Sequence, residues 1–248
     1  MNRDVQAVLL VLLGGAVLRI SVTDVHLRYV KPEFAPALIV GGAVLLALGL
    51  IGVVDRGPAD GQGDCADGAG ALGDGHGHTP GAGPRVAWLL LLPVLAIFLV
   101  APPALGSYAA ARDSGAVADP GISDYPPLPP GDPVETGVVD YATRAVWDHG
   151  RTLTGRTVRI TGFVSLPETA EDDGWYLTRI ALSCCAGDGR AFKIKVVEGQ
   201  PAPPPDSWVQ VTGRYVPADV PPGDDVIPAI RALLVSTVPP PRNPYDEG

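Results

Sequence analysis

Two adjacent cysteines, Cys184 and Cys185, are the residues of this sequence best suited to chemistry. They lie in the segment LSCCAGDGR, between two predicted strands, and neighbouring strand residues point to opposite faces. A disulfide between them would be strained, because adjacent Cα atoms lie about 3.8 Å apart whereas bridged ones lie about 4.4–6.8 Å apart. We therefore expect two free thiols, which as soft ligands favour Cu(I), Zn(II) or a trivalent arsenical.

The cysteine pair also has a structural interpretation. A free cysteine packs well as a small apolar side chain, and two thiolates fall two ligands short of a tetrahedral zinc site. The sequence leaves both roles open for Cys184 and Cys185: residues of a core, or metal ligands.

A second candidate metal site lies in the glycine-rich stretch 55–85, which contains His76 and His78 together with Cys65 and Asp74. Histidine-rich tracts bind metal ions without needing a fold. The alternative is a linker in which these side chains have no role. We expect the stretch to be disordered, because its composition cannot bury a core.

No motif for catalysis accompanies these residues. The sequence has no glycine-rich phosphate loop, no Cys-x-x-Cys motif and no Ser/His/Asp or Cys/His set indicated by local context. We therefore expect a protein that is not an enzyme, with thiol redox chemistry at the cysteine pair as the alternative.

Composition and charge narrow the class of protein. The chain has 248 residues, a formal net charge of −9, 46% hydrophobic residues and only 18% charged ones. From residue 107 onward, 19 Asp and Glu outnumber 12 Lys and Arg, which opposes binding to nucleic acid because that needs a basic surface. The 27 prolines and 31 glycines predict prominent linkers.

Three apolar stretches predict transmembrane helices, at residues 5–22, 36–54 and 86–108. Each is long enough to cross a hydrocarbon layer of about 30 Å as a helix. A signal peptide is the alternative for the first stretch, but no cleavage site followed by polar sequence precedes the second. The three helices and the stretch 55–85 form a membrane domain at residues 1–111, and the lipid bilayer is its first expected partner.

The side on which the rest of the chain lies is not fixed by charge. Basic residues flanking the three stretches are balanced, three against three, so the positive-inside rule gives no direction. Because a short N-terminus is easily retained inside, we expect the C-terminal domain to be extracytoplasmic.

The remaining chain predicts a stalk and a small all-β domain. Residues 112–133 are rich in Pro and Gly, which is typical of an extended stalk, and residues 134–248 follow as the domain. An amphipathic helix is expected at 134–149. Five strands are expected, at residues 157–164, 175–183, 191–197, 208–216 and 230–238. Five short strands favour an OB-like five-stranded barrel over a seven-stranded sandwich.

Four blocks of the sequence resemble a known family. They are LRYVKPEFAPAL at 27–38, PRVAWLLLLPVLAIFLVAPPALGSYAA at 84–110, TGRTVRITGFV at 154–164 and LTRIALSCCAGDGR at 177–190. In these blocks the chain resembles a family of uncharacterised bacterial multi-pass membrane proteins regarded as permease subunits. Members have two spans, a variable loop, a third span and a C-terminal β domain with a cysteine pair, here Cys184 and Cys185. Their variable loop is often richer in histidine than residues 55–85.

The resemblance implies a place in the bacterial cell membrane and a larger permease subunit as partner. Two functions follow as expectations. The first is an accessory, non-enzymatic subunit of a membrane permease, which anchors the OB-like domain beside the larger transport subunit. The second is a membrane-tethered binding module that holds a soft metal or metalloid through Cys184 and Cys185.

Overall fold

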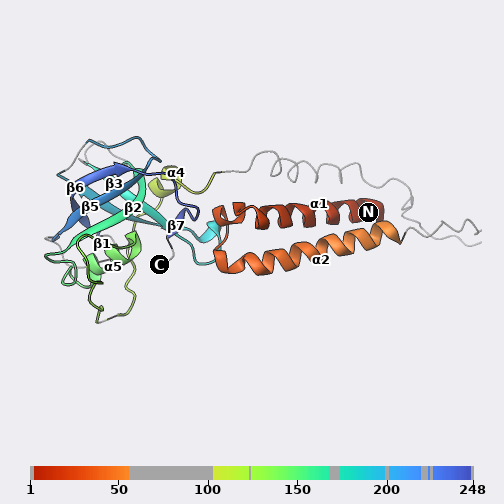
Figure 1. The fold of residues 1–248 in the computed structure, drawn as a ribbon, viewed down its shortest axis with the longest axis horizontal. Helices are drawn as coiled ribbons and strands as arrows, with labels where there is room; N and C mark the ends of the chain where they lie inside the picture. Colours follow the sequence, from red (N-terminus) through yellow and green to blue (C-terminus); the bar gives the residue numbers. More distant parts are fainter. Residues whose placement is uncertain are drawn as a thin grey trace, which may run out of the picture. The chain divides into compact units, whose positions relative to one another are not determined.

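The chain forms two compact units in the computed structural model, which describes residues 3–55, 103–122, 124–167, 174–198, 201–218, 223 and 226–246. The first unit consists of Met1–Val25 and Glu33–Pro102, and the second of His26–Pro32 and Pro103–Gly248. Figure 1 shows that the described part of the first unit is helical and that the second is built mainly from strands.

Two apolar helices, α1 (Arg3–Val22) and α2 (Ala35–Val54), pack against each other in the first unit (Figure 1). Glycines allow the backbones to approach closely. A Cβ on Gly14 would lie 2.6 Å from the backbone nitrogen of Leu46, and one on Gly42 would lie 3.0 Å from a leucine of α1. Gly14 and Gly42 therefore lie in the contact between α1 and α2.

Of the three predicted spans, the structure supports one. Within the described residues, Pro32–Val54 is the helix that is long and apolar enough to cross a membrane. The predicted span 5–22 is helical, but its apolar part, Gln6–Val22, is shorter because charged residues precede it. The predicted span 86–108 and the stretch 55–85 lie largely outside the described residues, and positions 103–108 belong to the second unit.

The second unit is built around a closed five-stranded barrel (Figure 1). The five strands are β2 (Thr157–Ser165), β3 (Trp175–Ala181), β4 (Arg190–Val197), β5 (Trp208–Val216) and β6 (Ala229–Thr237). β2 pairs antiparallel with β3 and β5, β3 pairs with β4, β4 runs parallel to β6, and β6 pairs with β5, which closes the sheet. The barrel is consistent with the predicted OB-like fold, and all five predicted strands are present.

The barrel interior is apolar because inward-facing residues alternate along its strands. One fully buried side chain from each strand illustrates this: Ile160, Leu177, Ile194, Val209 and Ile230. Burying a side chain of this size contributes about 1.5–3 kcal/mol to folding. This core fixes the five strands, and therefore the positions of the turns that connect them.

The predicted helix 134–149 is shorter than expected. Val134–Glu135 forms a short strand, β1, parallel to β2, and the helix α5 spans Val138–Trp147. Gly137 separates them with an extended backbone and, as the N-cap of α5, offers no side-chain cap. The apolar spacing that predicts a helix continues across this break, so the boundary was not visible in the pattern.

The missing cap of α5 comes from a distant part of the chain. A last short strand, β7 (Tyr245–Asp246), pairs parallel with β3. It brings Asp246 to the start of α5, where Oδ2 accepts the N–H groups of Val138 at 3.0 Å and Val139 at 3.4 Å. A carboxylate here also interacts favourably with the helix dipole.

The predicted stalk 112–133 is a packed part of the second unit. Its described residues contain no helix or strand, yet Val117 is only 1% exposed and Leu128 only 7%. Trp147 of α5 donates its indole N–H to the Val117 carbonyl at 2.8 Å. The prediction of a separate stalk is wrong, because the few apolar residues of this segment pack beside α5 and the barrel.

A short helix, α4 (Ser107–Ala111), precedes that segment and also packs on the barrel. Its Ala110 is fully buried in a cluster with Phe163 and Ile180. Ser107 and Tyr108 were predicted as the end of the span 86–108, and both belong to the second unit instead.

Candidate metal site

The turn between β3 and β4 carries the cysteine pair. A short 3₁₀ helix, η4 (Ala186–Asp188), follows directly after Cys184 and Cys185. Cys185 has an extended backbone and is the N-cap of η4. Because every residue of β3 pairs with a residue of β4, the two strands hold both ends of this turn in place.

One carboxylate organises the turn from within. Asp188 Oδ1 accepts the N–H of Ser183 at 2.8 Å, and Oδ2 accepts the N–H groups of Cys184 at 2.8 Å and Cys185 at 3.4 Å. Asp188 was not among the predicted site residues. Sequence reasoning had no signal for it, because a capping box is recognised in sequence as Ser or Thr followed three residues later by Glu or Gln, whereas Cys185 and Asp188 take these places here.

Both cysteines are free thiols. Cys184 is exposed and Cys185 is half-buried, so Cys184 does not serve as a core residue. The two Sγ atoms and one carboxylate oxygen of Asp188 all lie within 4.8 Å of one another. In the described part of the chain, these three side chains form a group able to hold a metal ion with two soft ligands and one hard ligand.

The Cys184 thiol and the Asp188 carboxylate affect each other's protonation. A hydrogen bond to Asp188, followed by one to Cys185, raises the pKa of Cys184 to about 11. The hydrogen bond from Cys184, helped by three backbone N–H groups of the turn, lowers the pKa of Asp188 to about 2. At neutral pH a protonated thiol therefore lies beside an ionised carboxylate. A bound metal ion would displace that thiol proton.

A segment far away in sequence holds the same turn from outside. Residues 29–31 pair with residues 184–186, and both belong to the second unit. Val30 and Cys185 form an antiparallel bridge. Beside it, the Lys31 N–H donates to the Cys184 carbonyl at 3.2 Å, and the Ala186 N–H donates to the Tyr29 carbonyl at 2.7 Å. The Tyr245 hydroxyl donates to the Arg28 carbonyl at 2.7 Å. The backbone of the cysteine turn is thus fixed from two directions.

The other predicted ligands, His76 and His78, lie outside the described residues, as does Cys65. Of the predicted metal ligands, the described structure therefore brings together Cys184 and Cys185 and adds Asp188. The two histidines stay a prediction.

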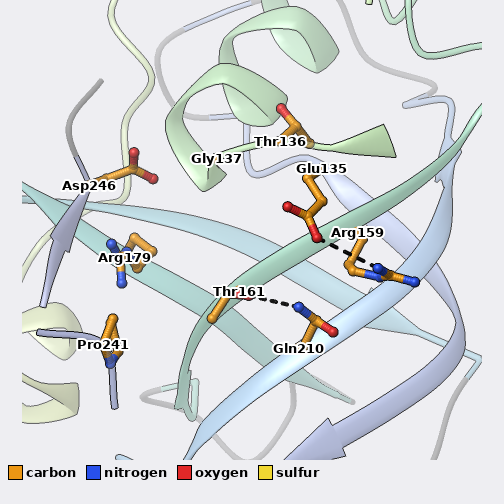
Figure 2. A pocket seen from close by; sticks show the side chains of 9 residues that line it. All are labelled: Glu135, Thr136, Gly137, Arg159, Thr161, Arg179, Gln210, Pro241 and Asp246. Atoms are coloured by element: carbon orange, nitrogen blue, oxygen red, sulfur yellow. Dashed lines mark hydrogen bonds and ion pairs between the residues drawn. The ribbon is translucent and has the colours of Figure 1, made fainter. Parts of the chain in front are cut away.

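A second, polar site is an open groove of about 490 Å³ on the barrel (Figure 2). Polar side chains from several strands line it: Glu135, Arg159, Thr161, Arg179, Gln210 and Asp246. Arg159 forms an ion pair with Glu135 at 3.5 Å, and Arg179 donates to the Tyr245 carbonyl at 2.7 Å. Two guanidinium groups and two carboxylates offset each other, so the groove has no excess charge that would select an ionic ligand. No sequence motif announced these residues, because they come from separate strands.

Comparison with known proteins adds one finding to this geometry. No curated protein matches the chain. A family model matches residues 142–246, a range that includes the barrel and the three side chains of the candidate metal site. The helices α1 and α2 lie outside the match, so the multi-pass layout and the permease connection stay predictions. The chain contains, at residues 142–246, a DUF1980 C-terminal domain, which defines an uncharacterised family.

Proposed function

We propose that the chain is a membrane-tethered binding module for a soft metal ion, held through Cys184 and Cys185. The observation that carries this proposal is the convergence of both Sγ atoms and an Asp188 oxygen within 4.8 Å. Thiolates select soft or borderline ions such as Cu(I) and Zn(II), and disfavour Mg²⁺ and Ca²⁺, which prefer oxygen ligands.

The arrangement of the turn supports an exchangeable site. Backbone N–H groups that donate to Asp188, together with the pairing with residues 29–31, order the backbone before any ion binds, so binding costs little conformational entropy. Three protein ligands leave one position of a tetrahedron open, whereas structural zinc sites are closed by four. Cys184 is exposed, so an ion reaches it directly from outside the domain.

Attachment to a membrane is the second part of the proposal. It is supported by Pro32–Val54, whose length and composition suffice to cross a bilayer. The outward side of α2 is apolar and exposed, as a lipid-facing surface must be. Its exposed large residues include Val40, Val44, Leu48 and Ile51.

The test uses the full chain, purified in detergent without chelator and titrated with Zn²⁺, Co²⁺ or Cu(I). We expect one ion per chain and a thiolate-to-cobalt charge-transfer band with Co²⁺. The Cys184→Ser/Cys185→Ser variant should lose both, whereas Cys65→Ser, a matched cysteine control, should keep them. Absence of binding in the unmodified chain, or unchanged binding in the double variant, would refute the proposal.

The second candidate is an accessory subunit of a membrane permease, with a larger transport subunit as partner. One observation favours it: among the described residues, no atom lies within 4 Å of a Cβ built on Gly41 of α2, so this part of the helix offers a surface that a helix of another protein can approach. Isolation from native membranes should yield a stable complex with a multi-span membrane protein. Recovery of the chain without such a partner, under conditions that preserve other membrane complexes, would count against it.

A further inference from the structure

The cysteine turn is tied to the start of the one described helix that is long enough to span a membrane. Val30 pairs with Cys185, and the candidate span begins at Pro32, two residues later. At about 3.3–3.6 Å per extended residue, Pro32 lies at most about 7 Å from Val30. Paired antiparallel residues have Cα atoms about 4.5–5.5 Å apart. The Cα of Cys185 therefore lies within about 13 Å of the first residue of the span.

This upper limit places the Cα of Cys185 in the surface layer of a bilayer or within a few ångströms of it. A bilayer measures about 40–45 Å with its headgroups and about 30 Å without them, which leaves about 5–8 Å of headgroup layer on each side. The residues beside Val30 suit that layer. Arg28 is exposed and Phe34 is 42% exposed, and basic and aromatic side chains are enriched at membrane–water interfaces.

We propose that the cysteine turn works on the membrane surface, where it holds its metal ion at the lipid headgroups on the face at which α2 begins. The ion rests on the proposed function, whereas the place of the turn rests on the pairing of Val30 with Cys185. The surface that receives the turn is the bilayer itself, whose phosphate groups complement Arg28. An ion held at this height is placed for exchange with a membrane-embedded partner.

This placement also assigns residues at the two ends of α2 to opposite faces of the membrane. Glu33, at the start of the span, shares a face with Cys184, because both adjoin residues 29–31. Asp55, which caps the other end of α2, then lies on the opposite face.

Depth is tested on the full chain in phosphatidylcholine vesicles, with a bimane fluorophore on Cys184 after Cys65→Ser and Cys185→Ser have removed the other thiols. We expect strong quenching by lipid spin-labelled at the headgroup and weaker quenching by lipid labelled deep in the acyl chain. The control is a fluorophore at Arg231→Cys in a chain without native cysteines. Arg231 pairs with Val197 of β4, whose neighbour Val196 pairs with Trp175 at the start of β3. The start of β3 lies about 20 Å along the strand from its end at the cysteine turn. Equal headgroup quenching at both positions, or none at Cys184, overturns the proposal.

Sidedness is tested with single-cysteine chains labelled by a membrane-impermeant maleimide in sealed vesicles of uniform orientation. Cys184 and Glu33→Cys should react from the same side, and Asp55→Cys should react only from the other side. Reaction of Asp55→Cys and Cys184 from one side overturns the proposal. Neither measurement uses a metal ion, so failure of metal binding and failure of the membrane placement are separate results.

Discussion

Val30, in the connection between two apolar helices, forms an antiparallel bridge with Cys185, in the turn that carries both thiols. The same turn is organised from within by Asp188, which accepts three backbone N–H groups. The two sets of contacts fix the backbone and leave the chemistry to the side chains of Cys184 and Cys185. A rigid backbone with polarised side chains is the usual basis of a selective site.

Asp188→Asn should make Cys184 more reactive. The hydrogen bond to the Asp188 carboxylate is the main cause of the raised pKa of Cys184, about 11, and an amide removes the charge. Each pKa unit recovered increases the thiolate fraction about tenfold at neutral pH. Alkylation of Cys184 by iodoacetamide, followed by mass spectrometry at pH 7, should therefore be about tenfold faster. Asp124→Asn, which removes an exposed carboxylate elsewhere, should leave the rate unchanged, and an unchanged rate in Asp188→Asn would contradict this assignment.

Metal affinity should rise with pH across the neutral range. Because the pKa of Cys184 is about 11, its thiol is protonated at pH 7, and a metal ion must release that proton. Affinity should increase about tenfold per pH unit for each proton released, up to the pKa of the thiol. Titration with Zn²⁺ at several pH values in non-coordinating buffers measures the slope. A flat profile would mean that Cys184 is not a ligand.

Asp246→Ala should destabilise the domain by about 1 kcal/mol, the usual cost of losing a helix cap. The carboxylate accepts the N–H groups of Val138 and Val139, and no other cap of α5 exists among the described residues. Chemical unfolding of the barrel, followed by tryptophan fluorescence of the full chain in detergent, measures the loss. Asp124→Ala at an exposed position is the matched control and should change the free energy of unfolding by less than about 0.5 kcal/mol. Equal effects of the two variants would show that the capping contact adds no stability.

Gly150→Ala should cost far more stability than Gly155→Ala. Both glycines have left-handed backbones, with φ of 65° and 75°. An alanine in this conformation lowers the free energy of unfolding by about 1 kcal/mol or more. A Cβ on Gly150 would also overlap the ring of Tyr215, whereas a Cβ on Gly155 would have no neighbour within 4 Å in the described part of the chain. Overpacking of this kind adds about 1–3 kcal/mol. Thermal melting of the two variants checks the order, and similar melting temperatures would contradict the close approach of Tyr215.

Gly14→Val should separate the helix pair, and Gly15→Val should not. A Cβ on Gly14 would lie 2.6 Å from the Leu46 nitrogen, whereas no atom of the described residues lies within 4 Å of one on Gly15. Small residues at such positions allow close packing of helices in a membrane. Melting of the helical circular dichroism signal in detergent compares the variants. Equal melting temperatures would place the contact face of α1 elsewhere.

The sequence predicted those parts of the fold that depend on local patterns. Strand-like runs of residues located all five barrel strands. In β2 the alternation was clear, because Val158 and Ile160 are buried while Arg159 and Thr161 are only partly buried. The adjacent positions of Cys184 and Cys185 predicted two free thiols, because the distance between neighbouring Cα atoms, which disfavours a disulfide, is set by the chain itself.

The parts that the sequence did not reveal depend on contacts between distant residues. The strands β1 and β7 are two residues long, too short for any periodicity, and pairing alone defines them. Asp246 as the cap of α5 and Val30 as the partner of Cys185 follow from tertiary structure. Asp188 was missed as well, because its hydrogen bonds to the cysteine turn form a capping box without the Ser or Thr and the Glu or Gln by which such a box is recognised in sequence.

The hydrogen bond between the Tyr245 hydroxyl and the Arg28 carbonyl spans 217 residues, which sets an order for biosynthesis. At 5–20 residues per second, Arg28 leaves the ribosome roughly ten to forty seconds before Tyr245 does. During that interval α2 and then the five barrel strands are made, so the connection at residues 26–32 waits for its native partners until the cysteine turn and β7 have been synthesised. Pairing of residues 29–31 with residues 184–186 therefore waits until the second partner has been made. A chain whose translation stalls before residue 184 would hold this connection while its thiol turn does not yet exist.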